Sequence, residues 1–150
     1  MGSLKKYFVL NGRLTALQYW RYQVRLAFAA VAVISATAFL TQVGGWLGAI
    51  PFAFVLPVLA AGVSVGVRRL HDRGKSAWWL ALFTLGPIAL VAPGQLVARD
   101  ATTGLLLAAA LLSLLGVILA VWAWIEIGFL RGQKGPNRYG ADPRALSSAA

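Results

Sequence analysis

The sequence predicts an all-α polytopic membrane protein with four transmembrane helices. Hydrophobic residues make up 59% of the 150 residues and charged residues 12%, well below the roughly 25% charged residues of a typical soluble domain. Four apolar runs, at residues 26–43, 46–67, 77–98 and 104–130, each reach the roughly 18 residues that can span a bilayer. Because the runs do not alternate between apolar and polar residues, they favour helices over barrel strands.

The distribution of basic residues predicts how these helices are oriented. Five basic residues precede the first run, four lie between the second and third, and four follow the fourth, whereas Arg99 alone lies in the other two connections. Positive charge concentrates in cytoplasmic segments. Both termini and the central loop at residues 68–76 are therefore expected in the cytoplasm. The net charge of +10 is interpreted as this topology signal, and no nucleic-acid partner is expected.

Residues 1–25 are expected to be cytoplasmic or interfacial. Thr15 and Gln18 fit a capping box, which predicts that a helix begins near Ala16. Arginines and aromatic residues alternate in the turns that follow, as is typical of a short helix in the headgroup layer. The first apolar run is interpreted as a retained membrane anchor, because three further runs follow it.

The second and third membrane helices are predicted to be kinked. Pro51 and Pro57 interrupt the second run, and Pro87 and Pro93, each beside a glycine, interrupt the third. Proline removes a helical hydrogen bond and clashes with the preceding turn. Broken membrane helices can line a transport pathway, so a small oligomeric transporter or channel is one alternative function. The other interpretation is that neighbouring helices satisfy the interrupted backbone.

The central loop contains the densest group of ionisable side chains. Two adjacent arginines beside a histidine at one membrane depth could match the oxygens of a phosphate. We predict the following side chains as contacts for an anionic headgroup or phosphate: Arg13, Arg68, Arg69, His71 and Arg73. A purely structural interpretation stays open, in which the arginines extend to the headgroups and Asp72 pairs or caps locally.

No catalytic residue, metal or cofactor is predicted. The chain has no cysteine, which excludes thiolate chemistry and cysteine metal sites. A membrane enzyme acting on a lipid phosphate, with His71 as acid/base, is a third function, but adjacent residues such as His71 and Asp72 do not face each other on a helix. A metal site would have to be assembled from His71, Asp72, Glu126 and Asp142.

Glu126 is the acidic residue inside a predicted span. A carboxylate in a membrane needs a partner or a proton. Because Glu126 lies five residues before Arg131, near the cytoplasmic end of its helix, we predict a pair with Arg68 or Arg69. The tail that follows, residues 131–150, is rich in turn formers and is expected to be a short irregular cytoplasmic segment.

Three motifs together resemble a known family. They are Phe8-x-x-Asn-Gly-Arg13 with Gln18-Tyr-Trp20, Arg68-Arg-Leu-His-Asp-Arg-Gly-Lys-Ser-Ala-Trp-Trp79, and Gly135-Pro-Asn-Arg-Tyr-Gly-Ala-Asp-Pro143. This combination is similar to the YhaH-like bacterial inner-membrane proteins catalogued as domain of unknown function 805. The resemblance implies a small multi-span protein of the bacterial inner membrane. It implies no activity and no catalytic residue.

All three motifs fall on the side predicted to be cytoplasmic. We expect the chain, residues 1–150, to form one membrane domain whose motifs assemble into a single cytoplasmic cap. Structural pairs in this cap are predicted for Asp72, Glu126, Asn137, Tyr139 and Asp142. The remaining cations would bind membrane lipids with anionic headgroups, and a homo-oligomer or a membrane protein partner is the alternative.

Overall fold

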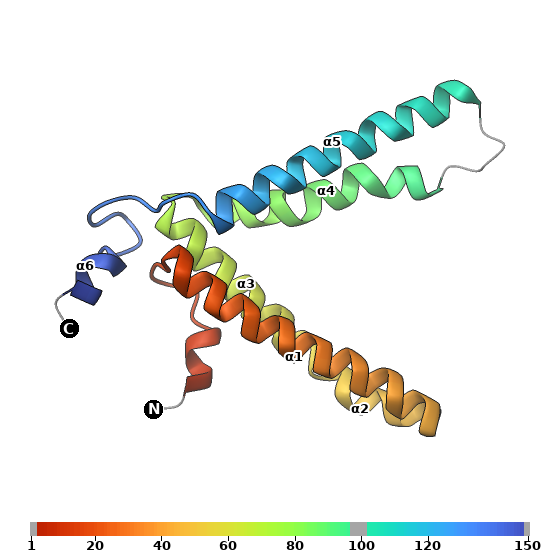
Figure 1. Ribbon diagram of the computed structural model, residues 1–150, viewed down its shortest axis with the longest axis horizontal. Coiled ribbons are helices and arrows are strands. Elements are labelled where there is room, and N and C mark those ends of the chain that lie inside the picture. The colour runs from red at the N-terminus through yellow and green to blue at the C-terminus, as the bar shows by residue number, and fades with distance from the viewer. Residues whose placement is uncertain (1–2, 97–101, 149–150) are drawn as a thin grey trace.

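The computed structural model describes residues 3–96 and 102–148, which form two long helical arms joined at one end (Figure 1). In the first arm, α1 (Ala16–Val43) runs beside a segment made of η2 (Gly45–Gly48), α2 (Ala49–Phe52) and α3 (Val55–Asp72). The second arm pairs α4 (Trp78–Leu96) with α5 (Thr103–Gly128). The arms diverge from their common end, and both described chain ends lie near it (Figure 1).

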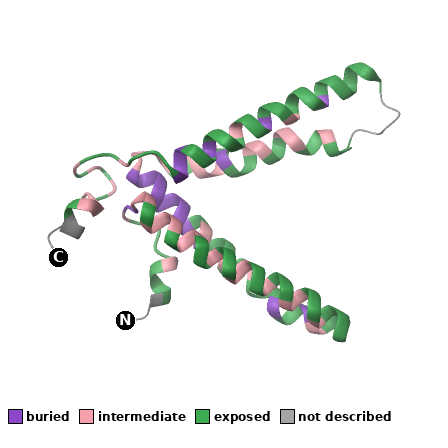
Figure 2. Ribbon diagram, viewed as in Figure 1, coloured by how far each residue is buried: buried purple, intermediate pink, exposed green. Residues whose placement is uncertain are grey.

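Within the described residues, four helical segments are long and apolar enough to cross a membrane: Ala16–Val43, Gly45–Asp72, Trp78–Leu96 and Thr103–Gly128. The predicted all-α class with four spanning segments is confirmed. Large hydrophobic side chains are exposed along both arms (Figure 2). An apolar surface of this extent is unfavourable in water, so it is the surface that contacts lipid.

The start of α1 follows the predicted capping box. The backbone N–H of Gln18 donates to Thr15 Oγ1 at 3.2 Å, and the backbone N–H of Thr15 donates to Gln18 Oε1 at 3.0 Å. The turns expected in the headgroup layer are continuous with the rest of α1, and the separate short helix η1 (Ser3–Tyr7) precedes them. Where the headgroup layer crosses α1 stays a prediction.

The second span is longer than the apolar run that predicted it. Helix α3 continues past Val67 to Asp72, so the segment between α3 and α4 is reduced to residues 73–77. The helix ends in a Schellman motif at Gly74, which has a φ of 72°. There the N–H of Gly74 donates to His71 O and that of Lys75 to Leu70 O. The residue that ends the helix therefore follows Arg68, Arg69 and Arg73.

The prolines occupy different settings in the two predicted kinked helices. In the second span the α-helix is interrupted at Ala53 and Phe54, between Pro51 and Pro57. In the third, Pro87 and Pro93 both lie inside α4. The kinks themselves stay a prediction.

The common end of the two arms contains most of the buried residues (Figure 2). We call it the vertex and define it as residues 13–20, 64–83 and 119–133. Its apolar core consists of Leu70 from α3, Phe83 from α4, and Ala123 and Ile127 from α5. Away from the vertex, α1 packs along α3 and α4 packs along α5, but contacts between the arms are sparse. The relative position of the arms is therefore determined at the vertex.

In the second arm, Gly116 allows α5 to approach α4 closely. A Cβ atom at Gly116 would lie 2.8 Å from Val91 Cγ2 and 3.1 Å from the carbonyl oxygen of Pro87. Gly116→Ala is expected to destabilise the protein by about 1–3 kcal/mol through overpacking. The matched variant is Gly104→Ala, at a position with no neighbouring atom within 4 Å. Thermal unfolding in detergent should show a lower midpoint for Gly116→Ala alone, and equal midpoints would contradict the close approach.

Candidate functional site

Arg69 lies at the centre of the vertex with no exposed surface. Its Nε donates to the carbonyl of Ile127 at 2.7 Å, and its Nη2 donates to that of Leu130 at 2.5 Å. Ile127 lies in the last turn of α5 and Leu130 just after the helix, where helix carbonyls lack partners within the helix and the helix dipole attracts a cation. The third nitrogen, Nη1, donates to Asp72 Oδ2 at 2.8 Å. Arg69 therefore joins α3 to the end of α5.

Asp72 is the shared partner of Arg69 and Arg13, and its side chain is 1% exposed. Arg13 donates to Asp72 Oδ1 through Nε at 3.1 Å and Nη2 at 3.0 Å. The remaining Arg13 donors reach the tail, at the carbonyls of Gln133 (2.5 Å) and Gly135 (2.6 Å). One carboxylate thus connects the segment before α1, helix α3 and the tail.

Two glycines give this cluster its shape. Gly12 has a φ of 94°, a conformation that L side chains rarely adopt, and it directly precedes Arg13. Gly132 lies against the Asp72 carboxylate, since a Cβ there would be 1.7 Å from Asp72 Oδ2. The tail can follow α3 this closely only because residue 132 has no side chain.

His71 is packed against the third motif. Its ring stacks on that of Tyr139 with 3.8 Å between centroids and 5° between planes. Its backbone carbonyl accepts a hydrogen bond from Asn137 Nδ2 at 3.0 Å, and its Nδ1 lies 3.3 Å from the carbonyl oxygen of Gly12. The predicted assembly of the three motifs into one cluster is confirmed by these contacts.

The predicted partner of Glu126 is wrong. Its carboxylate is bound by Arg73, through Nε and Nη2 at 3.0 Å each, and Lys75 Nζ lies 3.5 Å away. Because α3 continues past Val67, Arg73 lies one turn beyond Arg69 on the same helix face. The donors of Arg69 are occupied nearer the centre of the vertex, so the next arginine on that face reaches Glu126.

Lys75 occupies a box of aromatic rings between α4 and α5. Its Nζ lies 3.8 Å from the ring centroid of Trp79, 5.7 Å from that of Trp122 and 6.0 Å from that of Phe83. These distances are within the range of cation–π attraction. Sequence reasoning missed this role, although a lysine followed by two tryptophans one turn later was a signal for it.

Arg68 faces away from the cluster of Arg13, Asp72 and Arg69. Its Nη2 donates to the carbonyl of Lys6 at 2.6 Å, and its guanidinium lies 5.7 Å from the ring centroid of Tyr22. Sequence reasoning grouped Arg68 with Arg69, but neighbouring residues on a helix point about 100° apart.

The buried hydroxyl of Ser64, which donates to Val9 O at 2.5 Å, was also missed by sequence reasoning, because a lone serine in an apolar helix gives no signal.

In the tail, Asp142 accepts hydrogen bonds from the backbone N–H groups of Gly135 and Arg144, both at 3.0 Å, and from Arg144 Nε at 3.2 Å. These donors, above all the backbone N–H of Arg144, lower the pKa of Asp142.

Asp142 also precedes α6 (Pro143–Ser148), so part of the tail expected to be irregular is helical. Aspartate at the N-cap followed by proline is a helix-start pattern.

The geometry gives the five predicted ligand contacts mainly internal partners. Arg13, Arg69 and Arg73 donate to carboxylates and to backbone carbonyls of the vertex and tail, Arg68 donates to Lys6 O, and His71 is stacked. The carboxylates of Asp72 and Asp142, which could orient a catalytic His71, are bound by arginines instead. Among the described residues, no three histidine, aspartate or glutamate side chains lie close enough to hold a metal ion.

Comparison with known proteins places the three motifs in one family. Residues 7–141 match the family described as protein of unknown function, DUF805. The chain belongs to the DUF805 family. It is 31% identical over 83 residues to the inner membrane protein YhaH of Escherichia coli, in strains K12 and O157:H7, which covers 55% of this chain and 69% of each relative. No solved structure matches the chain.

This DUF805 chain is thus a membrane protein, similar to an inner membrane protein. The matched region of the family begins at Tyr7 and ends at Ala141, so it contains every residue of the Arg13–Asp72–Arg69 cluster. The pair of Glu126 with Arg73 also lies within the family region, whereas the contact of Asp142 with Arg144 lies beyond it.

Asp72→Asn tests whether the shared carboxylate holds this DUF805 chain together. The substitution keeps the shape of the side chain but leaves two buried guanidinium groups without their counter-charge, which we expect to cost about 3–5 kcal/mol. Asp142→Asn, at a carboxylate that binds one arginine instead of two, is the matched control. Thermal unfolding in detergent should show a large loss for Asp72→Asn and a small one for Asp142→Asn, and similar losses would contradict the central role of Asp72.

The lowered pKa of Asp142 predicts that the mobility of the tail depends on pH. A carboxyl group with a pKa lowered by folding stabilises the fold above its unfolded pKa of 3.8, and this contribution is lost as the pH falls through the lowered value. Because the chain lacks cysteine, a nitroxide label on Ala141→Cys reports tail mobility specifically. We expect constant mobility from neutral pH to about pH 4.5 and greater mobility in stronger acid. In an Asp142→Asn background, the label should be mobile at neutral pH already.

Proposed function

We propose that this protein binds anionic phospholipid at the cytoplasmic surface of the bacterial inner membrane, through exposed basic residues around the vertex. The observation that carries this proposal is the separation of its cations into two sets. One set is buried or half-buried and is occupied by internal partners. The other set is exposed and has no ion pair among the described residues.

The internal set accounts for each carboxylate that the structure describes. Asp72 binds Arg13 and Arg69, Glu126 binds Arg73 and Lys75, and Asp142 binds Arg144. Because these pairs are made within the chain, they are unsuited to bind a ligand. The hypothesis that Arg13, Arg69 and Arg73 contact a headgroup is therefore replaced by one that uses the cations outside the cluster.

The external set surrounds the same end of the molecule. It comes from η1, the first turns of α1 and the tail, all of which lie near the vertex (Figure 1). Each cation close to an anionic membrane surface contributes about 1 kcal/mol of attraction. We call this set the basic collar, and its members are Lys5, Lys6, Arg21, Arg25, Arg131, Lys134 and Arg138.

The collar also supports a cytoplasmic position for both termini. Both apolar arms extend away from the collar as they diverge (Figure 1), so a bilayer that contains both arms has the collar at one surface. Basic residues concentrate on the cytoplasmic side. The same cations thus orient the protein and attract anionic lipid.

The two alternatives have less support from the geometry. An enzyme would need His71 to reach a substrate, but His71 is 8% exposed and stacked on Tyr139. A transporter would need polar groups along a pathway. The hollow between the arms, about 440 Å³, is lined mainly by apolar residues such as Leu59 and Val63.

The proposal predicts selective retention of anionic lipid. Purified protein in mixed micelles of phosphatidylglycerol and phosphatidylethanolamine should retain phosphatidylglycerol preferentially, as measured by mass spectrometry of the extracted lipid. Replacing Arg131, Lys134 and Arg138 together by Gln should reduce this preference, since about 1 kcal/mol is lost per charge. The preference should also fall with added salt.

A matched variant separates charge from side-chain shape. Replacing Arg131 and Arg138 by Lys keeps both charges and should keep the preference for phosphatidylglycerol. A wild-type protein with no preference, or a preference unchanged in the Gln variant, would refute the proposed function.

A further inference from the structure

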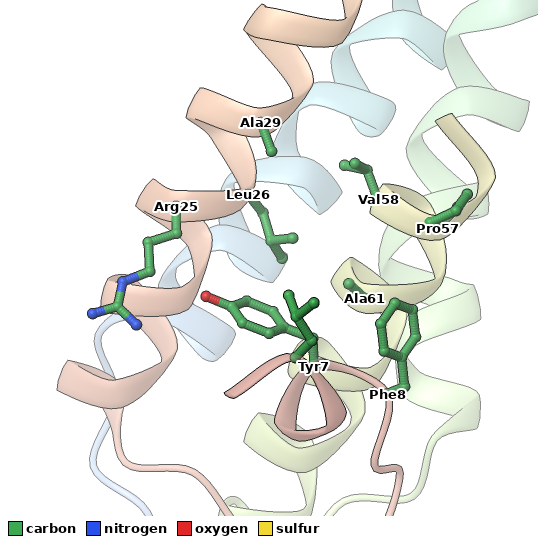
Figure 3. Close-up of a pocket in the computed structure, with 9 residues that line it drawn as sticks. Tyr7, Phe8, Arg25, Leu26, Ala29, Pro57, Val58 and Ala61 are labelled. Carbon is green, nitrogen blue, oxygen red and sulfur yellow. The ribbon is translucent and has the colours of Figure 1, made fainter. Parts of the chain in front are cut away.

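A groove between η1, α1 and α3 has the features of a specific lipid site. Its volume is about 260 Å³, below the roughly 300–1,000 Å³ of pockets for drug-sized ligands. Figure 3 shows side chains from all three segments around this space. Among the described residues that line the groove, none is Arg13, Arg69 or Asp72, so the groove is separate from the cluster around Asp72.

Small side chains on the two facing helices keep the groove open. Ala29 from α1 and Ala61 from α3 lie on opposite walls (Figure 3). Leu26, Val58 and Phe8 also contribute to a lining that is almost entirely apolar. A narrow apolar space of this size suits part of an acyl chain.

The mouth of the groove is basic. Arg25 lines the groove, is exposed and has no ion pair among the described residues. The hydroxyl end of Tyr7 points to the side on which Arg25 lies (Figure 3). Arg21 is one turn earlier on the same face of α1, and η1 contributes Lys5 and Lys6. An occupant with an apolar chain and an anionic end matches both parts of this surface.

Buried polar groups hold η1 against the groove. Arg68 donates to the carbonyl of Lys6 at 2.6 Å, and Ser64 donates to that of Val9 at 2.5 Å. Tyr22 also contacts Tyr7 edge to face, with 4.9 Å between ring centroids. Burying Arg68 and Ser64 costs free energy unless they are hydrogen-bonded, and these contacts do not join the two arms. Their structural result is the position of η1 as one wall of the groove.

We propose that this groove binds one anionic phospholipid, with an acyl chain between Ala29 and Ala61 and the phosphate on Arg25. This inference rests on the proposed function and names a site for it. A guanidinium fork matches the oxygens of a phosphate. A second copy of the chain is a poorer occupant, because a two-fold interface would place the same basic rim against itself.

The test compares the first lipid retained by the protein in native mass spectrometry, with phosphatidylglycerol or phosphatidylethanolamine added to detergent micelles. Arg25→Gln should weaken the first phosphatidylglycerol about fivefold, which corresponds to the contribution of one surface cation. Ala29→Phe fills the groove without changing charge and should abolish this preferred lipid. The matched control is Ala38→Phe, at an exposed position farther along α1, which should keep the first site. Lys134→Gln removes a collar charge away from the groove and should weaken the first phosphatidylglycerol less than Arg25→Gln does.

A second measurement does not depend on a bulky substitution. Because the chain has no cysteine, Ala29→Cys gives one thiol in the groove and Ala38→Cys one outside it. Phosphatidylglycerol should slow alkylation of Ala29→Cys by a membrane-permeant maleimide, and phosphatidylethanolamine should not. Alkylation of Ala38→Cys should be equal in both lipids.

The outcomes distinguish the site from the wider function. Equal weakening by Arg25→Gln and Lys134→Gln, with Ala29→Phe unchanged, would overturn the groove and leave a diffuse collar. Equal binding of the two lipids at the first site would overturn the assignment of an anionic headgroup there. If the wild-type protein shows no preference for phosphatidylglycerol at all, the proposed function and the site are both refuted.

Discussion

The relative position of the two arms depends on the buried carboxylate of Asp72. A buried charge is costly unless it is paired and hydrogen-bonded, and Asp72 is paired with Arg13 and Arg69. The remaining donors of these arginines are bound by backbone carbonyls at the end of α5 and in the tail. The cluster thus replaces the large apolar interface that holds soluble helical domains together, which a protein with lipid-facing helices cannot use in the same way.

The sequence predicted the parts of this structure that depend on local pattern. The apolar runs predicted four spanning segments, and Thr15 and Gln18 predicted the start of α1. The partner of Glu126 could not be predicted, because it depends on how far α3 extends and on which arginine faces α5. Gly74, not the first charged residue, ends α3. This places Arg73 rather than Arg68 on the face toward Glu126.

The cations of the three motifs look equivalent in the sequence but differ in three dimensions. Arg68 and Arg69 are adjacent, yet one binds a carbonyl beside η1 and the other binds the end of α5. Residue type and spacing do not distinguish such roles, since the helix phase and the competing acceptors decide them. By contrast, Arg21 and Arg25 lie one turn apart on α1 and remain exposed. Exposure after internal pairing, and not proximity to the histidine, is therefore the criterion by which we propose the ligand contacts.

Because the two arms are joined at one end only, a bound lipid can stabilise a part of the fold that the junction does not reach. Away from the vertex the arms make few contacts with each other, so the rest of this chain leaves much of each helix pair uncovered. A lipid bound in the groove would contact α1, α3 and η1 together, and η1 is itself held by Ser64 and Arg68 from α3. Because a ligand that binds only the folded arrangement stabilises it by mass action, an anionic lipid would stabilise the first arm where the Asp72 cluster does not reach.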